Sequence, residues 1–337
     1  MSINSTLSPP DAGPFRLSVI VPTYNRGSFL PGCIESLRKA GVPDLEIIIV
    51  DDGSTDDTRA VVASLGSDLR YIYQDNQGLS AARNTGIRAS RGRFIAYLDS
   101  DDFWLPGVAD NLIGFLEHHP QLGAVFADAR MGNPESGYVS WFDAAGREEF
   151  RSLPAEHVEL GLRMLEPLPF YRLMLSRNAI FTGAVILRRE VVSQHGLFNP
   201  ALLSTGDWEV WLRLIHQTRF AYSMEPLAIY TKHAGAMTAD REFMQQGWCD
   251  TLLTHAKLGL ALAPEDRSRL DQALRNHLFS HAYLAYDGHD YSLARRRFAK
   301  VIYESGFEWP SALYWLICAL PKPIPRMVRR LKNLIAV

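Results

Sequence analysis

Short apolar runs alternate with segments of helical period over the N-terminal part of the chain, and this alternation constrains the fold more than any other feature. The runs predicted to be strands span residues 17–21, 45–50, 70–73 and 94–98. The predicted helices span residues 28–40, 55–65, 80–89 and 106–118. Strands and helices that alternate in this way form a mostly parallel sheet with right-handed connections. The sequence therefore predicts an α/β fold.

Polar clusters follow the predicted strands, at the points where the strands end. They are PTYNR at 22–26, DDGSTD at 51–56, NQGLSAARN at 76–84 and DSDD at 99–102. In open α/β sheets, ligands bind beyond the carboxyl ends of the strands. The helices that follow these loops also point backbone N–H groups toward any anion bound there. We therefore predict the functional site at these loops, although each cluster alone is also typical of an ordinary turn or helix cap.

Three carboxylates, those of Asp99, Asp101 and Asp102, lie within four residues of one another. Their charges repel, and holding them unpaired beside a buried strand is costly. A hard divalent cation relieves this repulsion, and Mg²⁺ or Mn²⁺ is typically bound by one or two carboxylates together with the oxygens of a diphosphate. The pattern favours a metal site, and a solvated acidic loop is the alternative.

The composition limits the other classes of function. Hydrophobic residues make up 47% of the 337 residues and charged residues 21%, as is typical of a soluble globular protein. The formal net charge of -2 provides no field that recruits nucleic acid, so we expect no nucleic-acid partner. Cys33, Cys249 and Cys318 form no CxxC pair, which argues against a disulfide framework or a cysteine metal site. A reducing, cytoplasmic compartment fits this pattern.

Composition and periodicity divide the chain into four segments. Residues 1–15 are rich in Ser, Pro and Asn and are predicted to be a disordered tail. Residues 16–245 are predicted to form the α/β domain, in which 131–166 shows no clear period and is interpreted as an irregular insertion that shapes a pocket. Residues 246–305 are predicted to be a helical extension, and 306–337 a basic amphipathic tail.

The predicted tail combines an apolar stretch with a basic one. Residues 311–320 are apolar, but this stretch is shorter than the ~20 residues that a helix needs to cross a bilayer. Basic residues then alternate with apolar ones; they are Arg326, Arg329, Arg330 and Lys332. Such segments bind the interface of membranes that contain anionic lipid. The alternative is a helix packed on the protein's own surface.

Taken together and in order, the polar clusters resemble those of one family. The segments SVIVPTYNR at 18–26, VDDGSTDDT at 50–58, GLSAARNTG at 78–86 and LDSDD at 98–102 are similar to those of the family 2 inverting glycosyltransferases, which have a GT-A fold. The resemblance continues more weakly through Asp207 and His233 and stops before residue 245. It implies a Rossmann-like, mostly parallel central sheet flanked by helices, here with a C-terminal helical extension.

The resemblance also implies roles for residues in the four loops. The nucleoside would be contacted by Pro22, Thr23, Tyr24 and Asp51, with Asp52 beside them. Arg83 would order the donor site near the diphosphate. Asp99 and Ser100 would lie near the ribose, Asp101 would bind the metal, and Asp102 would share or replace that role.

A later segment, TGDWEVWLR at 205–213, is similar to the one that carries the family's catalytic base, although Gly206 stands where the family has Glu. Asp207 would accordingly deprotonate the acceptor hydroxyl. Asp207 also precedes a helix predicted at 208–216, so a role as helix cap is the alternative. Glu209 is the competing candidate for the base, but the apolar stripe of the predicted helix suggests that Glu209 points elsewhere.

Two further segments extend the resemblance. In YTKH at 230–233, His233 would lie near the metal and the diphosphate, and Lys232 would face phosphate. A structural role is the alternative for this histidine. Thr182 and Gly183 are similar to a loop on the acceptor side, and packing explains such small residues equally well.

The function implied by the resemblance is metal-dependent transfer of a sugar from a nucleotide-diphosphate sugar, a UDP-sugar by family precedent, to a hydroxyl acceptor. The cofactor would be Mn²⁺ or Mg²⁺, the acceptor a carbohydrate or lipid-linked molecule, and the context bacterial surface polysaccharide or glycoconjugate synthesis. The enzyme would act in the cytoplasm, at the inner face of the membrane if the tail binds lipid. The alternatives are a nucleotidyltransferase, whose Gly-rich basic loop is absent after the first strand, and a non-catalytic nucleotide- or sugar-binding protein.

Overall fold

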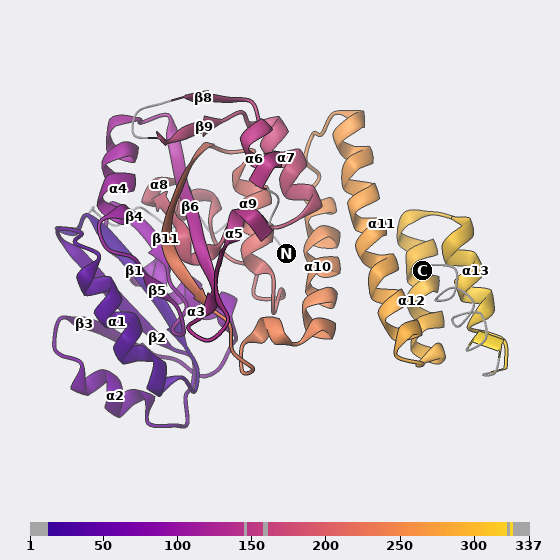
Figure 1. Ribbon diagram of the computed structural model, residues 1–337, viewed down its shortest axis with the longest axis horizontal. Coiled ribbons are helices and arrows are strands. Elements are labelled where there is room, and N and C mark those ends of the chain that lie inside the picture. The colour runs from indigo at the N-terminus through magenta and orange to yellow at the C-terminus, as the bar shows by residue number, and fades with distance from the viewer. Residues whose placement is uncertain (1–12, 145–146, 158–160, 322–323, 326–337) are drawn as a thin grey trace. The chain divides into compact units, whose positions relative to one another are not determined.

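The structure is a computed structural model that describes residues 13–144, 147–157, 161–321 and 324–325. The chain forms two compact units, of which the first ends at Ala236 and the second begins at Met237 (Figure 1). The boundary predicted between residues 245 and 246 falls inside a helix of the second unit, whereas the structure divides the chain before that helix.

The first unit contains all the strands of the described chain. They are β1 (Leu17–Thr23), β2 (Leu45–Asp51), β3 (Leu69–Tyr73), β4 (Phe94–Tyr97), β5 (Phe103–Trp104), β6 (Leu122–Asn133), β7 (Gly137–Ser140), β8 (Ala155–His157), β9 (Arg163–Leu165), β10 (Val185–Arg188) and β11 (Arg219–Thr231). The helices are α1 (Leu30–Lys39), α2 (Thr58–Ser64), α3 (Leu79–Ala89), α4 (Val108–His118), α5 (Trp141–Ala144), α6 (Arg147–Ser152), α7 (Pro167–Ser176), α8 (Arg189–His195) and α9 (Gly206–Leu214). The described part of this unit also contains the 3-10 turns η1 (Gly27–Phe29) and η3 (Thr182–Ala184).

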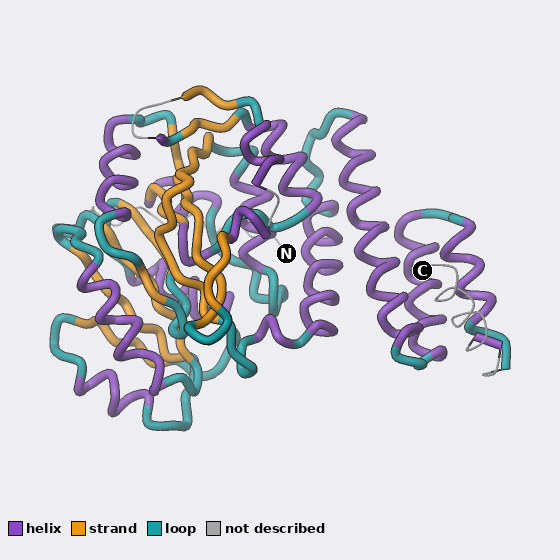
Figure 2. The backbone as a smooth tube through the Cα atoms, in the orientation of Figure 1, coloured by secondary structure: helices purple, strands orange, loops and turns teal. Residues whose placement is uncertain are grey.

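The strands, orange in Figure 2, form a single sheet. The order along its main path is β3-β2-β1-β4-β10-β6-β11-β9-β8, while β5 pairs with β11 and β7 pairs with β6. Strands β1 to β4 are parallel, as predicted. Strand β10 is antiparallel to both β4 and β6, and β11 is parallel to β6. The sheet is therefore mixed beyond β4, and the predicted α/β fold is confirmed.

Both faces of the parallel half are covered by helices. Leu17, Val19 and Val21 point into a core that α1 and α4 complete. On the opposite face Ile20 meets α3, where a Cβ placed on Gly86 would stand 2.3 Å from the Ile20 side chain. This close approach explains why the strands read as continuous apolar runs rather than as alternating ones.

The region predicted to be an irregular insertion has regular structure. Strand β7 pairs with β6, and β8 and β9 extend the sheet beyond β11. These strands are three or four residues long, too short to show a period in the sequence. The tail predicted at residues 1–15 lies outside the described residues up to residue 12. Beyond it the chain is ordered, because the Gly13 amide donates to the Arg91 carbonyl and the Arg91 guanidinium covers the Phe15 ring.

The regular elements in the described part of the second unit are helices. It contains η4 (Met237–Ala239), α10 (Arg241–Ala256), α11 (Pro264–Asp287), α12 (Tyr291–Ser305) and α13 (Trp309–Ile317). Asp240 caps α10 through the Phe243 amide, and Asp290 caps α12 through the Leu293 amide. The tail predicted at 306–337 thus begins with a helix, while 322–323 and 326–337 lie outside the described residues.

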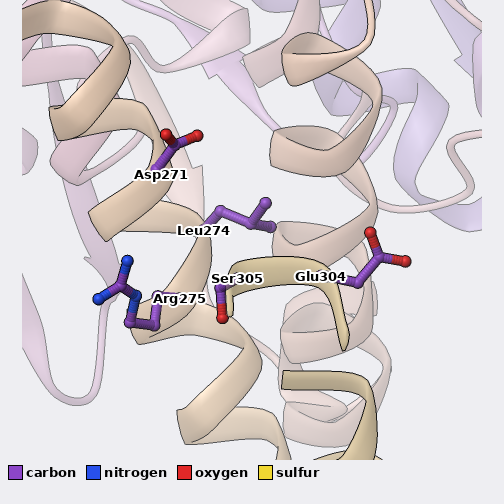
Figure 3. Close-up of a pocket in the computed structure, with 5 residues that line it drawn as sticks. All are labelled: Asp271, Leu274, Arg275, Glu304 and Ser305. Carbon is purple, nitrogen blue, oxygen red and sulfur yellow. The ribbon is translucent and has the colours of Figure 1, made fainter. Parts of the chain in front are cut away.

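A small hollow of about 160 Å³ lies in the second unit, where α11 meets the end of α12 (Figure 3). It is lined by Asp271, Leu274, Arg275, Glu304 and Ser305. Every site residue predicted from the sequence belongs to the first unit, whereas the residues that line this hollow belong to the second. Among the described helices, none is both long and apolar enough to cross a membrane.

Candidate active site

The strand directions bring the predicted loops to one edge of the sheet. Strands β1, β2, β3 and β4 are parallel, so the loops that follow them share an edge. Strand β10 runs antiparallel to β4, which brings the preceding turn η3 to the same edge. Strand β6 is antiparallel to β10, and β11 is parallel to β6. Strand β11 therefore runs in the same direction as β4, and its carboxyl end lies at the same edge. The segments around 22, 51, 99, 182 and 231 therefore converge.

The loop after β1 is tied to the loop after β2 by Asn25. Its side-chain oxygen accepts hydrogen bonds from the amides of Thr55 and Asp56, at 2.8 and 3.3 Å. Asn25 adopts a positive φ of 52°, a conformation that Asn tolerates better than most residues. Pro22 and Thr23 are buried, Tyr24 is exposed, and the buried Thr23 Oγ1 has no hydrogen-bond partner in the described chain.

Asp51 and Asp52 are both buried but have different environments. Asp51 accepts hydrogen bonds from the Ser54 amide at 2.8 Å and from the Tyr71 hydroxyl at 2.6 Å. Asp52 accepts from the amides of Gln77 and Gly78, at 2.9 and 2.8 Å. The Asp52 carboxylate thus fixes the loop that leads into α3.

Arg83 of α3 is buried and reaches Asp99 at the end of β4. Its Nη2 donates to Asp99 Oδ1 at 2.8 Å, and its guanidinium lies 5.3 Å from the centre of the Phe198 ring. Burial by itself lowers the pKa of Arg83, but the charges of Asp99 and Asp207 raise it above its ordinary value. Its Nε is buried without a partner in the described chain. An anionic ligand would satisfy this donor.

The next carboxylate, that of Asp101, meets an imidazole and a guanidinium. Asp101 Oδ2 lies 3.0 Å from His233 Nε2 and 3.0 Å from Arg26 Nη1. The two nitrogen atoms are 3.2 Å apart. Because β4 and β11 end at the same edge, residues far apart in the sequence form this cluster.

Asp102 and Ser100 occupy the buried side of the same turn. Asp102 Oδ1 accepts a hydrogen bond from the Thr231 amide at 2.9 Å. Burial raises the pKa of Asp102 well above its ordinary value, and the charges of Asp99 and Asp101 raise it further. Asp102 therefore joins the ends of β4 and β11, and its environment disfavours a charged carboxylate.

Asp207 is held by two hydrogen bonds from the neighbouring segment. Asp207 Oδ2 accepts from Thr182 Oγ1 at 2.8 Å and from Asn178 Nδ2 at 3.0 Å. Helix α9 begins at Gly206, two residues earlier than the predicted helix, and Thr205 occupies the N-cap position. Asp207 lies in the first turn of α9, so the position predicted as a possible cap is not the cap.

Glu209 points into a different environment from Asp207. It is buried, and its two carboxylate oxygens accept from Arg213 Nε and Nη2 at 2.9 Å each. This bidentate ion pair joins successive turns of α9. The Glu209 carboxylate is thus engaged within its own helix.

The other predicted residues flank the cluster. The Gly183 carbonyl accepts a hydrogen bond from Trp104 Nε1 at 2.7 Å, which fixes η3 against β5. The Lys232 amide donates to the Gly132 carbonyl at 3.0 Å, and its side chain is exposed. Two residues of the cluster, Asn178 and Arg26, had no role in the sequence-based prediction. Arg26 stands in the quoted PTYNR motif, whereas no sequence signal marks Asn178.

The donor chemistry of Asp101 and His233 fits a divalent cation. A carboxylate oxygen and an imidazole nitrogen converge within 3.0 Å of each other, and both are ligands for Mn²⁺. Within the described chain, no group of three or more His, Cys, Asp or Glu side chains is placed to hold a metal. The remaining ligands would therefore come from a diphosphate and from water.

Comparison with known proteins identifies the class to which this fold and site belong. The family model described as "Glycosyl transferase family 2" matches residues 18–194, which is more than half of the chain. The solved structure of S. aureus TarS 1-349 in complex with UDP has 20% identity and a TM-score of 0.55, over 79% of this chain and 72% of that one. Mannosyltransferase PcManGT from Pyrobaculum calidifontis, in complex with GDP-Man and Mn²⁺, has 19% identity and a TM-score of 0.54, over 97% and 87% of the two chains. These structures share the GT-A fold.

Two curated relatives are also glycosyltransferases by name. An uncharacterized glycosyltransferase of Haemophilus influenzae is 28% identical over 64% of this chain and 68% of its own length. EpsH of Bacillus subtilis is 42% identical over 29% of both chains. The chain thus spans less than a third of EpsH. The chain belongs to glycosyl transferase family 2.

Proposed function

We propose that the protein transfers a sugar, with inversion, from a nucleotide-diphosphate sugar to a hydroxyl acceptor, and that Asp207 is the base. The observation that carries the proposal is the position of the Asp207 carboxylate. It is held by Thr182 and Asn178 and lies within electrostatic reach of Arg83, which in turn binds Asp99. A carboxylate at the acceptor side and a buried arginine at the donor side are what a single displacement requires.

The Asp207 carboxylate suits proton abstraction because one of its oxygens remains available. Both hydrogen bonds go to Oδ2, and no described residue donates to Oδ1. Thr182 and Asn178 act as positioning residues that orient the carboxylate, and Oδ1 would accept the acceptor's proton. Direct attack of the deprotonated hydroxyl at the anomeric carbon needs no covalent intermediate on the enzyme.

We propose that Asp101 and His233 hold Mn²⁺ or Mg²⁺. When bound, the cation supplies positive charge that stabilises the diphosphate leaving group. Arg83 would add a second positive charge there, through the Nε donor that has no partner within the described chain. PcManGT, whose solved structure is similar to this chain, is in complex with Mn²⁺, and this supports the proposal.

The nucleobase of the sugar donor would lie against Pro22, Thr23 and Tyr24. Asp51 would contact the uracil or the ribose. The unpartnered Thr23 Oγ1 supports this location, because a buried hydroxyl without a partner gains a hydrogen bond from a ligand. We propose a UDP-sugar as donor, since TarS is in complex with UDP and with UDP-GlcNAc. Relatives include the chondroitin synthase of Escherichia coli, 34% identical over 37% of this chain, which supports a role in bacterial polysaccharide or glycoconjugate synthesis.

We also propose that the second unit binds the inner face of a membrane through α13. Trp309, Leu313 and Leu316 are 75%, 53% and 52% exposed. Their spacing of four and three residues places them on one side of the helix. The other side is occupied, since Tyr314 stacks on Phe298 at 5.2 Å between ring centres. One face of α13 therefore packs on the unit and another presents apolar side chains to solvent.

Charge favours anionic lipid as the partner of this face. After Glu308 the sequence contains no acidic residue and five basic ones: Lys322, Arg326, Arg329, Arg330 and Lys332. An apolar helix face followed by a basic segment suits the interface of a membrane with anionic lipid. A second copy of the same face would bring like charges together. The acceptor would then be a lipid-linked or carbohydrate molecule met at that surface.

The experiment that tests the proposed activity is a donor screen. Release of nucleoside diphosphate is measured with UDP-, GDP- and dTDP-sugars, with Mn²⁺ or Mg²⁺, and again with excess chelator. We expect release from a UDP-sugar that requires the metal and that is lost in Asp101→Asn. Full turnover in excess chelator would contradict the proposed metal dependence. Release from GDP- or dTDP-sugars alone would contradict the proposal that the donor is a UDP-sugar.

A further inference from the structure

We propose that Arg26 is a built-in cation that competes with the divalent metal for Asp101 and His233, and so couples metal binding to donor binding. The proposal rests on the metal dependence proposed above. It concerns a residue of the loop after β1 whose guanidinium contacts both proposed metal ligands.

Three atoms of different elements form a close triangle. Arg26 Nη1 lies 3.0 Å from Asp101 Oδ2 and 3.2 Å from His233 Nε2, and the two ligand atoms are themselves 3.0 Å apart. Arg26 comes from the loop after β1, Asp101 from the turn after β4 and His233 from the end of β11. The positive group is therefore within hydrogen-bond distance of both ligand atoms.

Counting donors and acceptors shows what this triangle requires. A guanidinium nitrogen has two hydrogens and no lone pair, so Arg26 Nη1 can donate to both Asp101 Oδ2 and His233 Nε2. His233 Nε2 either accepts from Arg26 Nη1, when the ring proton is on Nδ1, or donates to Asp101 Oδ2, when the proton is on Nε2. In both tautomers Arg26 Nη1 donates to Asp101 Oδ2. A divalent metal bound by Asp101 Oδ2 and His233 Nε2 needs a lone pair of each, so it competes with the hydrogen bonds of this triangle, including that of Arg26.

The other contacts of Arg26 hold it in place without burying it. Arg26 Nη2 donates to the Gly235 carbonyl at 2.5 Å, and the guanidinium lies 5.4 Å from the centre of the Phe29 ring. The Phe29 ring also lies 5.2 Å from the His233 ring. The side chains of Arg26 and Asp101 remain 24% and 19% exposed. A partly exposed ion pair of this kind can open without leaving a buried charge.

This arrangement makes metal and donor depend on each other. Without the nucleotide-sugar, the charge of Asp101 is already compensated by Arg26. A metal ion then gains little binding free energy, because it must displace the guanidinium. A diphosphate provides anionic oxygens for the released guanidinium and ligands for the metal. Binding of the nucleotide should therefore raise the affinity for the metal, and by linkage the metal should raise the affinity for the nucleotide equally.

Mn²⁺ binding to the full-length protein tests the proposal without measuring turnover. Free Mn²⁺ is followed by electron paramagnetic resonance, with and without saturating UDP. In Arg26→Gln we expect Mn²⁺ to bind the UDP-free protein about tenfold more tightly than in the wild type, an effect within the range typical of coupled sites. The enhancement of Mn²⁺ affinity by UDP should shrink correspondingly. Arg26→Lys keeps the charge and should resemble the wild type.

Two controls separate the possible results. Arg38→Gln breaks an exposed pair with Asp68 and should leave Mn²⁺ binding unchanged. Asp101→Asn should weaken Mn²⁺ binding in the presence of UDP. If Asp101→Asn weakens it while Arg26→Gln behaves as the wild type, Arg26 does not compete and only this proposal fails. If Asp101→Asn binds Mn²⁺ as the wild type does, the metal site is elsewhere and both proposals fail.

Discussion

The hydroxyl of Thr182 donates a 2.8 Å hydrogen bond to Asp207 Oδ2, and this contact joins two separate segments of the chain. Thr182 begins the turn before β10, and Asp207 lies in the first turn of α9. Because β10 runs antiparallel to β4, its beginning meets the carboxyl end of β4, where Asp99 and Asp101 lie. The reversed strand thus brings the proposed base to the edge of the sheet that carries the donor loops.

Replacing Asp207 by Asn should abolish transfer without unfolding the protein. Asn retains a carbonyl oxygen that can accept the hydrogen bonds from Thr182 and Asn178, but it cannot take a proton. A general base contributes roughly 10²–10⁴-fold to the rate, and we expect a loss of that size in kcat. The thermal midpoint and the affinity for UDP should stay close to those of the wild type. Turnover at the wild-type rate would show that Asp207 is not the base.

The matched change at Glu209 should have the opposite pattern. Glu209 forms a buried bidentate ion pair with Arg213. Glu209→Gln leaves the Arg213 guanidinium in place without a negative charge beside it. We expect a loss of about 3 kcal/mol in the free energy of unfolding, measured by urea denaturation. Activity per folded molecule should remain. A loss of turnover in folded Glu209→Gln with none in Asp207→Asn would instead identify Glu209 as the base.

Thr182 should act through Asp207 rather than on the substrate. Thr182→Val has nearly the same shape but cannot donate to Asp207 Oδ2, so the carboxylate should lose its orientation. We expect kcat to fall about tenfold, in proportion to one lost charge-assisted hydrogen bond, while KM for the donor is unchanged. Thr182→Ser restores the hydroxyl and should recover kcat. An equal rise in the donor KM would contradict a positioning role.

The parallel half of the fold could be predicted from the sequence because local signals agree there. Strands β1, β2 and β4 are apolar runs that end in polar clusters, and each following helix shows its own period. The positions of Asp51, Asp99 and Asp101 at one edge follow directly from parallel pairing. The roles of Asp51 and Asp101 remain predictions.

The second half could not be predicted in the same way. Strands β7, β8 and β9 have only three or four residues, and their pairing depends on β6 and β11 rather than on local sequence. The contact of Asn178 with Asp207 and that of Arg26 with His233 depend on the tertiary fold. A recognisable motif also does not reveal what its side chains contact. Asp52 stands in such a motif, but its carboxylate accepts hydrogen bonds from the backbone before α3.

Glu46 should make the stability of the first unit depend on acid pH. Burial raises the pKa of Glu46, but hydrogen bonds from Ser18 and from the Arg91 amide and side chain outweigh this and hold the pKa below its ordinary value. A carboxyl whose pKa is lowered by folding stabilises the protein above its unfolded pKa, ~4.3 for Glu. That contribution is lost as the pH falls through the lowered, folded value.

Glu46→Gln tests this dependence. At pH 7 we expect the variant to be less stable than the wild type by about 1–3 kcal/mol, the usual range for hydrogen bonds to a charged group. The difference should stay constant above the unfolded pKa, ~4.3, and narrow as the pH falls below it and through the lowered folded value, because the wild type then becomes protonated as well. Urea midpoints at several pH values measure it. Asp68→Asn, at an exposed pair with Arg38, serves as the control and should change little. A constant difference at all pH values would contradict the role of Glu46.

The exposed face of α13 should bind anionic lipid. Full-length protein is mixed with vesicles of phosphatidylcholine alone or with phosphatidylserine, and bound protein is measured by sedimentation. We expect binding only to the anionic vesicles, and weaker binding at high salt because surface attraction is screened beyond about 10 Å at 0.1 M. Trp309→Ser with Leu313→Ser should abolish it, since both side chains are exposed and their loss removes apolar area without opening the core. Leu203→Ser, at an exposed leucine of the first unit, is the matched control.

The same variant distinguishes lipid from the other partners that could cover this face. If a second copy covers it, the wild type should be a dimer in sedimentation equilibrium, the double variant a monomer, and neither should bind vesicles. If the C-terminal residues of the same chain cover it, deletion of 326–337 should increase vesicle binding instead of reducing it. The lipid proposal predicts a decrease on that deletion, because Arg326, Arg329, Arg330 and Lys332 are removed and each basic residue near an anionic surface contributes about 1 kcal/mol. The sign of this single change therefore decides between attraction by the tail and occlusion by it.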